Sequence, residues 1–217
     1  MKQSSPYGPE SFLQDTHVSR ETLDRLRAYA DLLGVWNKKI NLIGKSTAPD
    51  LWRRHMLDSA QLYPLIPKAT KTLLDIGSGA GFPGLVLAIM GVPGVHLVES
   101  DQRKAAFLRE AARIASAPVA VHTARVEALK PFPVDVVTAR ALAPLSDLLA
   151  WAAPFLTENS RCIFPKGQNV EAELTQAHKM WTMNVDQRPS RTDPQSVIVC
   201  IGEVRRVQSQ HSSSPSS

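Results

Sequence analysis

An acidic residue and four closely spaced glycines lie between two apolar segments of the chain. Asp75 stands near the end of the first segment, and Gly77, Gly79, Gly81 and Gly84 follow it. Glycine lets the backbone turn tightly and approach a ligand closely. A loop of this kind between a strand and a helix offers free N–H groups at the positive end of the helix dipole. We therefore expect a nucleotide-like cofactor to bind at this loop.

Asp75 discriminates between the cofactors that such a loop can hold. A carboxylate beside the turn would repel the pyrophosphate of a dinucleotide, whereas S-adenosylmethionine has no phosphate and carries an ammonium and a sulfonium group. The spacing Gly77-x-Gly79-x-Gly81 after the acid is typical of class I methyltransferases. The run from Gly79 to Gly84 also matches the dinucleotide pattern G-x-G-x-x-G. Dinucleotide binding therefore remains an alternative, as does a glycine turn that holds no ligand.

Two further acidic residues follow later apolar segments. Glu99 ends the segment 95–98, 24 residues after Asp75. An acid at the end of the second strand of a doubly wound fold accepts hydrogen bonds from ribose hydroxyls, a role that suits either adenosine cofactor. After the third segment, the backbone of 123–127 and the side chain of Glu127 are expected to contact the adenine edge. The alternatives are a solvated turn acid at Glu99 and a helix start at Glu127.

Basic and imidazole side chains stand at other positions where chemistry could occur. Arg140 follows the fourth apolar segment and is expected to pair with the methionine carboxylate or with an RNA phosphate. Lys166 follows the fifth segment and is a similar case. For both, the alternative is an ordinary surface position. His55, Asp58 and Ser59 share one helix face, so they either form a structural cluster or offer polar groups to the active site.

The elements that would position these residues alternate between strands and helices from residue 71 onward. The expected strands are 72–76, 95–99, 119–123, 134–138, 161–165 and 196–205, and the expected helices are 82–90, 101–116, 145–154 and 170–177. Such alternation predicts an α/β, Rossmann-like fold in which a mostly parallel sheet is covered by helices on both faces. The hairpin-like character of the last strands predicts one antiparallel strand at the edge.

A helical part precedes this Rossmann-like domain. Ser19 fits the N-cap of a first helix, and Pro49 fits the first turn of a second helix that runs to about residue 63. We expect residues 17–70 to form a helical extension and residues 71–207 to form the Rossmann-like domain. The first 16 residues and the Ser-rich tail 208–217 are expected to be disordered.

Composition restricts the class of protein. Of the 217 residues, 43% are hydrophobic, and no apolar stretch approaches the roughly 20 residues that span a bilayer. Cys162 and Cys200 lie in apolar segments, and we interpret them as core residues in a reducing cytosol. A globular, cytoplasmic protein with no membrane partner and no metal site is therefore expected. Without a sustained exposed apolar face, a monomer is expected.

The net charge of +5 is concentrated in the N-terminal part of the chain. Between residues 38 and 54, one acid stands against five basic residues, which are Lys38, Lys39, Lys45, Arg53 and Arg54. A local excess of this kind suits a surface that binds nucleic-acid phosphates. The alternative is a solvated face without a partner.

In combination, these motifs resemble those of one known family. The motifs are Trp36-Asn37-Lys38 with Asn41-Leu42, Arg54-His55-Met56-Leu57-Asp58-Ser59, the run from Asp75 to Gly84, Arg125-Val126-Glu127, Arg140-Ala141 and Lys166-Gly167. From about residue 20 to 205, the chain resembles the bacterial small-subunit (16S) rRNA guanine-N7 methyltransferases, also called glucose-inhibited division protein B. Ala124 stands where the family usually has Gly or Ser, which is a mild departure.

The resemblance implies a class I methyltransferase with a seven-stranded, mostly parallel sheet and an N-terminal helical extension. It implies transfer of a methyl group from S-adenosylmethionine to N7 of a guanine in 16S rRNA of the small ribosomal subunit, without a metal. The cofactor-contacting positions expected from the motifs and the resemblance together are Asp75, Gly77, Gly79, Gly81, Phe82, Glu99, Arg125, Val126, Glu127 and Arg140.

Roles for the remaining candidates follow from the chemistry of that reaction. Guanine N7 bears no proton, so no general base is required, and His55 is the one candidate for such a role. Arg140 and Lys166 are expected to neutralise a carboxylate or a phosphate, and the basic residues of 38–54 are expected to dock the rRNA. A methyltransferase for a small molecule or a protein, and a dinucleotide-binding module, remain the alternatives.

Overall fold

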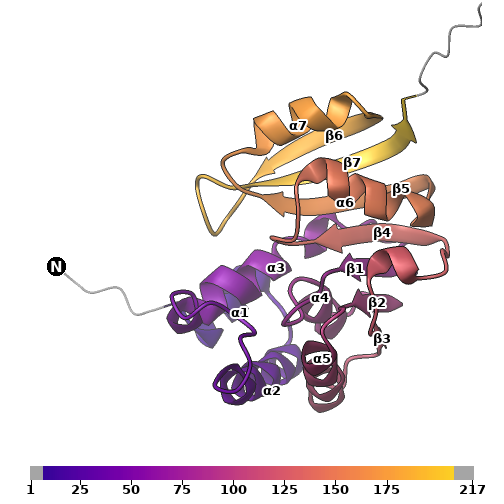
Figure 1. Cartoon of the computed structure of the whole chain (residues 1–217). Helices are drawn as coiled ribbons and strands as arrows, with labels where there is room; N and C mark the ends of the chain where they lie inside the picture. Colours follow the sequence, from indigo (N-terminus) through magenta and orange to yellow (C-terminus); the bar gives the residue numbers. More distant parts are fainter. Residues whose placement is uncertain (1–6, 208–217) are drawn as a thin grey trace, which may run out of the picture.

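A seven-stranded sheet forms the centre of the computed structural model, which describes residues 7–207 (Figure 1). The strands are β1 (Leu73–Ile76), β2 (Val95–Val98), β3 (Val119–His122), β4 (Val134–Ala139), β5 (Leu156–Lys166), β6 (Trp181–Pro189) and β7 (Val197–Arg206). Their order is β3-β2-β1-β4-β5-β7-β6. Among these strands, β7 runs antiparallel to β5 and β6, and all the other neighbouring pairs are parallel. The predicted Rossmann-like fold class is thus confirmed.

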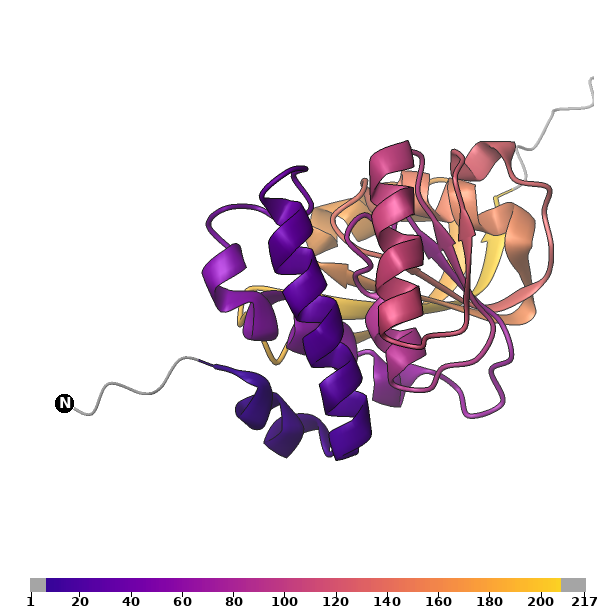
Figure 2. The same cartoon turned by 90° about the horizontal axis from the view of Figure 1, so that it is seen from below.

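Helices cover both faces of this sheet because alternate strand residues point to opposite sides. Leu73 and Val95 pack with α2 (Arg20–Asn37), α4 (Gly84–Ile89) and α5 (Gln102–Ile114). Leu74 and Val98 pack on the other face with α6 (Leu145–Ala152) and α7 (Val170–His178). On the first face, α2 lies beside α5 (Figure 2). Two apolar cores therefore hold the sheet from either side.

The C-terminal part of the sheet differs from the sequence prediction. Strand β6 was not predicted, and β7 is antiparallel but lies between β5 and β6 rather than at the edge. Only Trp181 and Met183 of β6 are buried, and the rest of this edge strand is largely exposed. An edge strand with so short an apolar pattern gives a weak sequence signal. Strand β5 also begins earlier than predicted, at Leu156.

The predicted disorder of the N-terminus is wrong where the structure describes it. Residues Pro9–Thr16 form helix α1, in which Phe12 is fully buried. The ring of Phe12 packs edge-on against that of Trp52, with centroids 5.4 Å apart. One buried aromatic residue is enough to hold this short helix against the rest of the protein. The sequence of such a helix shows little hydrophobic periodicity, so it is hard to predict. Residues 1–6 and 208–217, also expected to be disordered, lie outside the described residues.

The second predicted helix is a succession of shorter helical pieces. It consists of 3-10 turns at Ala48–Asp50 and Tyr63–Leu65, a π-helix at Trp52–Leu57 and α3 at Asp58–Ala60. The wider π-helical turn buries three consecutive residues, His55, Met56 and Leu57. π-helical turns are often found at functional sites. The uniform α-helix expected over 49–63 is therefore corrected.

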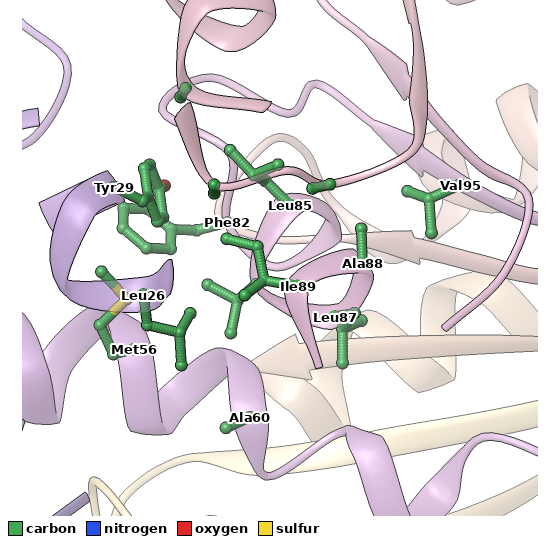
Figure 3. Packing of buried hydrophobic residues seen from close by; sticks show 14 of the residues in the cluster. Leu26, Tyr29, Met56, Ala60, Phe82, Leu85, Leu87, Ala88, Ile89 and Val95 are labelled. Carbon is green, nitrogen blue, oxygen red and sulfur yellow. The ribbon is translucent and has the colours of Figure 1, made fainter. Parts of the chain in front are cut away.

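Helix α2 of the helical extension packs against the glycine loop. Tyr29 of α2 is fully buried, and its hydroxyl donates to the carbonyl of Ala80. Its ring lies 5.6 Å from that of Phe82 (Figure 3). A Cβ on Gly81, whose φ is +97°, would stand 2.9 Å from the Tyr29 hydroxyl. Gly81 thus serves the packing of α2 against the loop.

Candidate active site

A cavity of about 420 Å³ opens at the carboxyl ends of β1, β2 and β4. This is the edge at which doubly wound folds bind their ligands. The predicted residues that line it are His55, Gly77, Gly79, Phe82, Glu99, Arg125, Val126, Glu127 and Arg140. We call this space the cofactor cavity. The structure thus brings together most of the candidates that are scattered over the sequence.

Glu99 ties the glycine loop to the end of β2. One of its carboxylate oxygens accepts from the N–H of Gly79 at 2.9 Å, and the other accepts from the N–H of Asp101 at 2.7 Å. Each oxygen keeps acceptor capacity, because a carboxylate has about four lone-pair sites. A carboxylate fixed in this way at the cavity wall can accept from ribose hydroxyls.

Asp75 does not line the cofactor cavity, so the predicted direct contact with a bound cation is corrected. Its side chain is fully buried, and Oδ1 accepts from the hydroxyl of Thr138 at 2.7 Å. Burial raises the pKa of Asp75 to about 6, and the hydrogen bond from Thr138 lowers it only in part. A Cβ on Gly84 would lie 2.6 Å from the Cβ of Asp75. Asp75 therefore packs beneath the start of α4, and Gly81, described above, also lies outside the cavity lining.

Arg140 is held by several protein groups at the end of β4. Its Nη1 donates to Asp58 Oδ2 at 3.0 Å and to the carbonyl of Arg54 at 3.1 Å. Its guanidinium carbon lies 5.1 Å from the ring centroid of Phe82. The side chains of Arg140 and Asp58 are only 17% and 16% exposed. The surface position considered for Arg140 is therefore excluded, and Arg140 instead connects the sheet to the helical extension.

His55 completes this cluster as a neutral imidazole. Its Nδ1 lies 2.8 Å from Arg140 Nη2, and because a guanidinium can only donate, Nδ1 must accept. The proton then resides on Nε2, which donates to the Thr47 hydroxyl at 2.9 Å. Burial, and secondarily the charge of Arg140, lower the pKa of His55 to about 4. His55 thus remains uncharged at neutral pH.

Asp58 also joins the cluster to the loop between β6 and β7. Its Oδ1 accepts from the hydroxyl of Thr192 at 2.7 Å and from the side-chain amide of Gln61 at 2.9 Å. We call Asp58, His55, Arg140 and Thr192 the polar cluster. Sequence reasoning missed Thr192, because no local pattern singles out a threonine in a loop. Ser59, predicted on the same face, instead donates to the carbonyl of His55.

A second cavity of about 740 Å³ lies next to the cofactor cavity. Both cavities are lined by His55, Arg140, Ala141 and Leu142, which form the boundary between them. Lys166 lines the second cavity and is bound at its Nζ by Glu173 Oε2 at 2.6 Å and by the carbonyl of Ala143 at 3.0 Å. The predicted exposed-surface alternative for Lys166 is excluded, since its side chain is only 8% exposed.

Comparison with known proteins identifies the family. The family described as rRNA small subunit methyltransferase G matches residues 22–196 of the chain. The chain belongs to this family. The protein named ribosomal RNA small subunit methyltransferase G in Rhodospirillum rubrum is 59% identical over 91% of this chain and 98% of its own length. Its namesake in Gluconobacter oxydans is 54% identical over 88% of this chain and 99% of its own length.

Solved structures share the fold at much lower sequence identity. A ribosomal protein L11 methylase from Lactobacillus delbrueckii has a TM-score of 0.58 and 16% identity, over 74% of this chain and 80% of its own. TYW2 from M. jannaschii has a TM-score of 0.55 and 14% identity, over 78% of this chain and 80% of its own. These likenesses show that the fold is shared.

The basic residues expected to meet RNA are all exposed, and all of them lie in the helical extension. Lys38, Lys39 and Lys45 lie at and after the end of α2, next to Leu42, Ile43 and Gly44 of the cofactor cavity. Arg54 lines the second cavity and lies 3.9 Å from Asp193. Arg53 lies over the ring of Tyr7, 6.0 Å from its centroid. A family that methylates rRNA needs a basic surface near its cavities.

Several residues of the cofactor cavity were missed by sequence reasoning. Among them are Leu42, Ile43, Gly44, Ile76, Ser78, Lys104, Leu142 and Trp151. One signal was available, since the side-chain oxygen of Asn37 accepts from the N–H groups of Leu42 and Ile43 and fixes that loop. Among residues 7–207, no group of three or more His, Cys, Asp or Glu could hold a metal ion. In the same range, no helix is both long and apolar enough to cross a membrane.

Proposed function

We propose that this protein transfers a methyl group from S-adenosylmethionine to N7 of a guanine in 16S rRNA. One observation carries the proposal beyond family membership. Two cavities meet at His55, Arg140, Ala141 and Leu142, and one of them is bounded by the glycine loop. A donor in the cofactor cavity would then face an acceptor base in the second cavity across this boundary. Methyl transfer needs this in-line arrangement of two separate ligands.

The cofactor cavity suits S-adenosylmethionine better than a dinucleotide. Gly77 and Gly79 have φ angles of +68° and +55°, which keep their backbone open to a close ligand. Glu99 and Glu127 line the same cavity together with Lys104, Arg125 and Arg140, so its charge alone does not select the cofactor, and membership of a methyltransferase family favours S-adenosylmethionine. The solved structure of M. jannaschii TYW2, which shares the fold, is a complex with AdoMet. Glu99 would orient the ribose, and the segment 125–127 would contact the adenine.

The protein's task in this reaction is alignment and charge placement. When bound, S-adenosylmethionine supplies an electrophilic methyl on its sulfonium, and the guanine N7 lone pair forms the new N–C bond as the C–S bond breaks. No proton leaves N7, so the neutral His55 is a positioning group for Arg140 and Thr47 and is not needed as a base. Residues at the boundary must hold N7 about 3–3.5 Å from the methyl carbon.

RNA docking completes the proposal. Lys38, Lys39, Lys45, Arg53 and Arg54 would contact phosphates and orient the small subunit over the second cavity. We further propose that the protein acts as a monomer, without a metal, in the cytoplasm. Arg140 and Lys166 already have acidic partners in the protein, so we assign them to the walls of the site rather than to free phosphates.

The direct test is methyl transfer from labelled S-adenosylmethionine to small ribosomal subunits from a strain that lacks the gene, followed by nucleoside analysis. We expect the label in 7-methylguanosine. Label in another nucleoside would contradict the assignment of N7, and label absent from RNA would move the function to another methyl acceptor.

Two simpler measurements address the alternative functions. Turnover on an RNA substrate should fall steeply as the salt concentration rises, whereas turnover on a small molecule should not. In thermal-shift titrations, S-adenosylmethionine should stabilise the protein, since a ligand raises stability when it binds the native state. Stabilisation by NAD instead would favour the dinucleotide-binding alternative.

A further inference from the structure

Lys166 and Glu173 place a donor and an acceptor side by side in the wall of the second cavity. Lys166 ends β5 and Glu173 lies in α7, and their Nζ and Oε2 atoms are 2.6 Å apart. Both residues line the cavity. The pair is largely buried, with side-chain exposures of 8% and 25%. A buried charge pair of this kind is held in one geometry, so it can present its remaining hydrogen-bonding groups in fixed directions.

Each member of the pair keeps one hydrogen-bonding group free for a ligand. The Lys166 ammonium has three N–H donors, of which one meets Glu173 and one meets the carbonyl of Ala143. Glu173 uses Oε2 for Lys166 and for the N–H of Leu145, which lies at 2.7 Å. Among residues 7–207, the hydrogen bonds of the structure leave Glu173 Oε1 without a donor. One donor and one acceptor thus remain available at adjacent positions.

The other charged groups of this cavity either pair with each other or are more exposed than Lys166 and Glu173. Asp58 accepts hydrogen bonds at both oxygens, from Arg140 on one side and from Thr192 on the other. Asp193 accepts from the N–H of Gln195 and lies near the exposed Arg54. Lys166 and Glu173 are therefore the charged pair best able to read the edge of a base.

Guanine carries the complementary pattern on its Watson–Crick edge. Its O6 is an acceptor, and the neighbouring N1–H and N2 amino groups are donors. Adenine has the opposite pattern at these two positions, with an amino donor at C6 and an acceptor at N1. A site that offers one donor beside one carboxylate oxygen therefore matches guanine and opposes adenine, since a mismatched base leaves buried groups unpaired.

We propose that Lys166 and Glu173 select guanine as the substrate base, which rests on the proposed function. Lys166 Nζ donates to O6, and Glu173 Oε1 accepts from N1–H and the N2 amino group. The two residues line only the second cavity, whereas His55, Arg140, Ala141 and Leu142 line both. When the Watson–Crick edge of the base contacts Lys166 and Glu173, its N7 edge points away from them, toward the boundary between the two cavities. Glu173 also places negative charge near a ring that becomes cationic on methylation.

The test compares guanine with inosine, which lacks only the N2 amino group. Small subunits are reconstituted with 16S rRNA that carries either base at the methylated position, and methyl transfer is measured by kcat/KM. For the unaltered protein, we expect guanine to be preferred by about 10- to 100-fold, the value of a hydrogen bond to a charged group. In Glu173→Ala this preference should fall below about 3-fold.

Matched variants separate recognition from structural support. Asp193→Ala removes another acid of the same cavity and should keep the preference for guanine. A purely structural role for Glu173 would lower kcat/KM equally for both bases, and an unchanged preference in Glu173→Ala would therefore overturn the proposal. If Glu173→Ala does not fold, Glu173→Gln keeps the size of the side chain and should still weaken the preference.

The controls also distinguish this proposal from the function on which it rests. If the unaltered protein methylates guanine and inosine equally well, base selection by this pair is wrong, but the proposed methyl transfer stands. If it methylates neither base in the small subunit while S-adenosylmethionine still stabilises the fold, the proposed function itself is wrong.

Discussion

The two cavities differ in how the chain builds them. The cofactor cavity is formed mainly by turns that directly follow β1, β2 and β3, together with the start of the loop after β4. The second cavity is formed by residues from the helical extension, the β4–α6 loop, the start of α7 and the loop between β6 and β7. The first is therefore encoded by local motifs, and the second by the packing of distant segments.

The polar cluster holds these distant segments together. Asp58 comes from the helical extension, Arg140 from the end of β4 and Thr192 from the β6–β7 loop, and all three meet through the Asp58 carboxylate. His55 then contacts Arg140 from the same helical segment as Asp58. Disturbing the glycine loop should therefore affect the cofactor first, and disturbing the cluster should affect the second cavity first.

The largest effect is expected from Gly77→Ala. A Cβ at this position would stand 2.6 Å from Leu142 Cδ2, and φ is +68°. Alanine must therefore displace Leu142 and accept a strained backbone, which costs about 1–2 kcal/mol. We expect the Kd for S-adenosylmethionine to rise at least ~100-fold, or about 3 kcal/mol. Isothermal titration measures this change.

Gly91→Ala is the matched control. Gly91 also has a positive φ, of +105°, but apart from its chain neighbours no atom of residues 7–207 lies within 4 Å of the added Cβ. It lies between the end of α4 and the start of β2, whereas the cavity lies at the carboxyl end of β2. This variant should lose comparable stability and keep its affinity for the cofactor. Equal loss of affinity in both variants would show that backbone strain alone explains Gly77→Ala.

The contrast between the cavities also explains what the sequence could predict. Gly77, Gly79 and Glu99, which the sequence predicts as cofactor-binding, line the cavity together, because their spacing falls within one turn and one strand end. Asp75 was assigned to the same cavity although it alternates with Leu74 and Ile76. Successive strand residues face opposite sides of the sheet, and Asp75 faces α4, whereas Ile76 lines the cavity.

The second cavity could not be predicted in the same way. Thr192 reaches Asp58 only because β6 and β7 form a hairpin beside β5, and β6 itself has too few buried residues to be recognised. Lys166 was singled out by its place after a strand, but its partner Glu173 lies in α7. Long-range pairings of this kind depend on the whole fold and leave no periodic signal.

The next largest effect is expected from Asp58→Asn. The change leaves the largely buried Arg140 cation without its carboxylate partner, which we expect to cost about 2 kcal/mol, since breaking a fully buried pair costs about 3–5 kcal/mol. Methyl transfer should fall about 10- to 100-fold as the second cavity loosens. The Kd for S-adenosylmethionine should change by less than about 3-fold. Single-turnover kinetics and titration give the two values.

Asp24→Asn provides the comparison for a pair on the surface. Asp24 pairs with Arg27 at 3.1 Å, but their side chains are 69% and 39% exposed. Exposed pairs contribute little, so stability should change by less than about 0.5 kcal/mol and activity should be unaffected.

For Asp58→Asn, a loss of cofactor affinity as large as the loss of methyl transfer would contradict the separation of the two cavities.

The polar cluster should also make stability depend on pH through His55. Its pKa is about 4 in the folded protein, below its ordinary value of 6.5. Between these two pH values, the unfolded chain therefore binds more protons than the folded protein. The free energy of unfolding consequently decreases as the pH falls through this window. At pH 5 this loss amounts to about 2 kcal/mol.

His55→Gln isolates this contribution, because glutamine is polar but does not titrate. The difference in free energy of unfolding between pH 7.5 and pH 5 should be smaller in the variant by about 2 kcal/mol. Urea titrations at the two pH values measure it. Asp75, whose pKa is raised, acts in the opposite direction and is present in both proteins. An identical pH dependence in the two proteins would mean that His55 carries a proton in the folded state.

The smallest effects are expected at the three basic lysines that line neither cavity. Lys38→Ala, Lys39→Ala and Lys45→Ala should each weaken binding to the small subunit several-fold and reduce the salt slope by about 1. Lys68→Ala removes an equally exposed lysine that precedes the amino end of β1, whereas the cofactor cavity lies at the carboxyl end of that strand, and it should change neither value. None of the four should alter cofactor affinity, because none lines the cofactor cavity. If Lys68→Ala reduced the salt slope as strongly as Lys45→Ala, RNA binding would depend on the net charge of the protein. A specific basic surface beside the two cavities would then be contradicted.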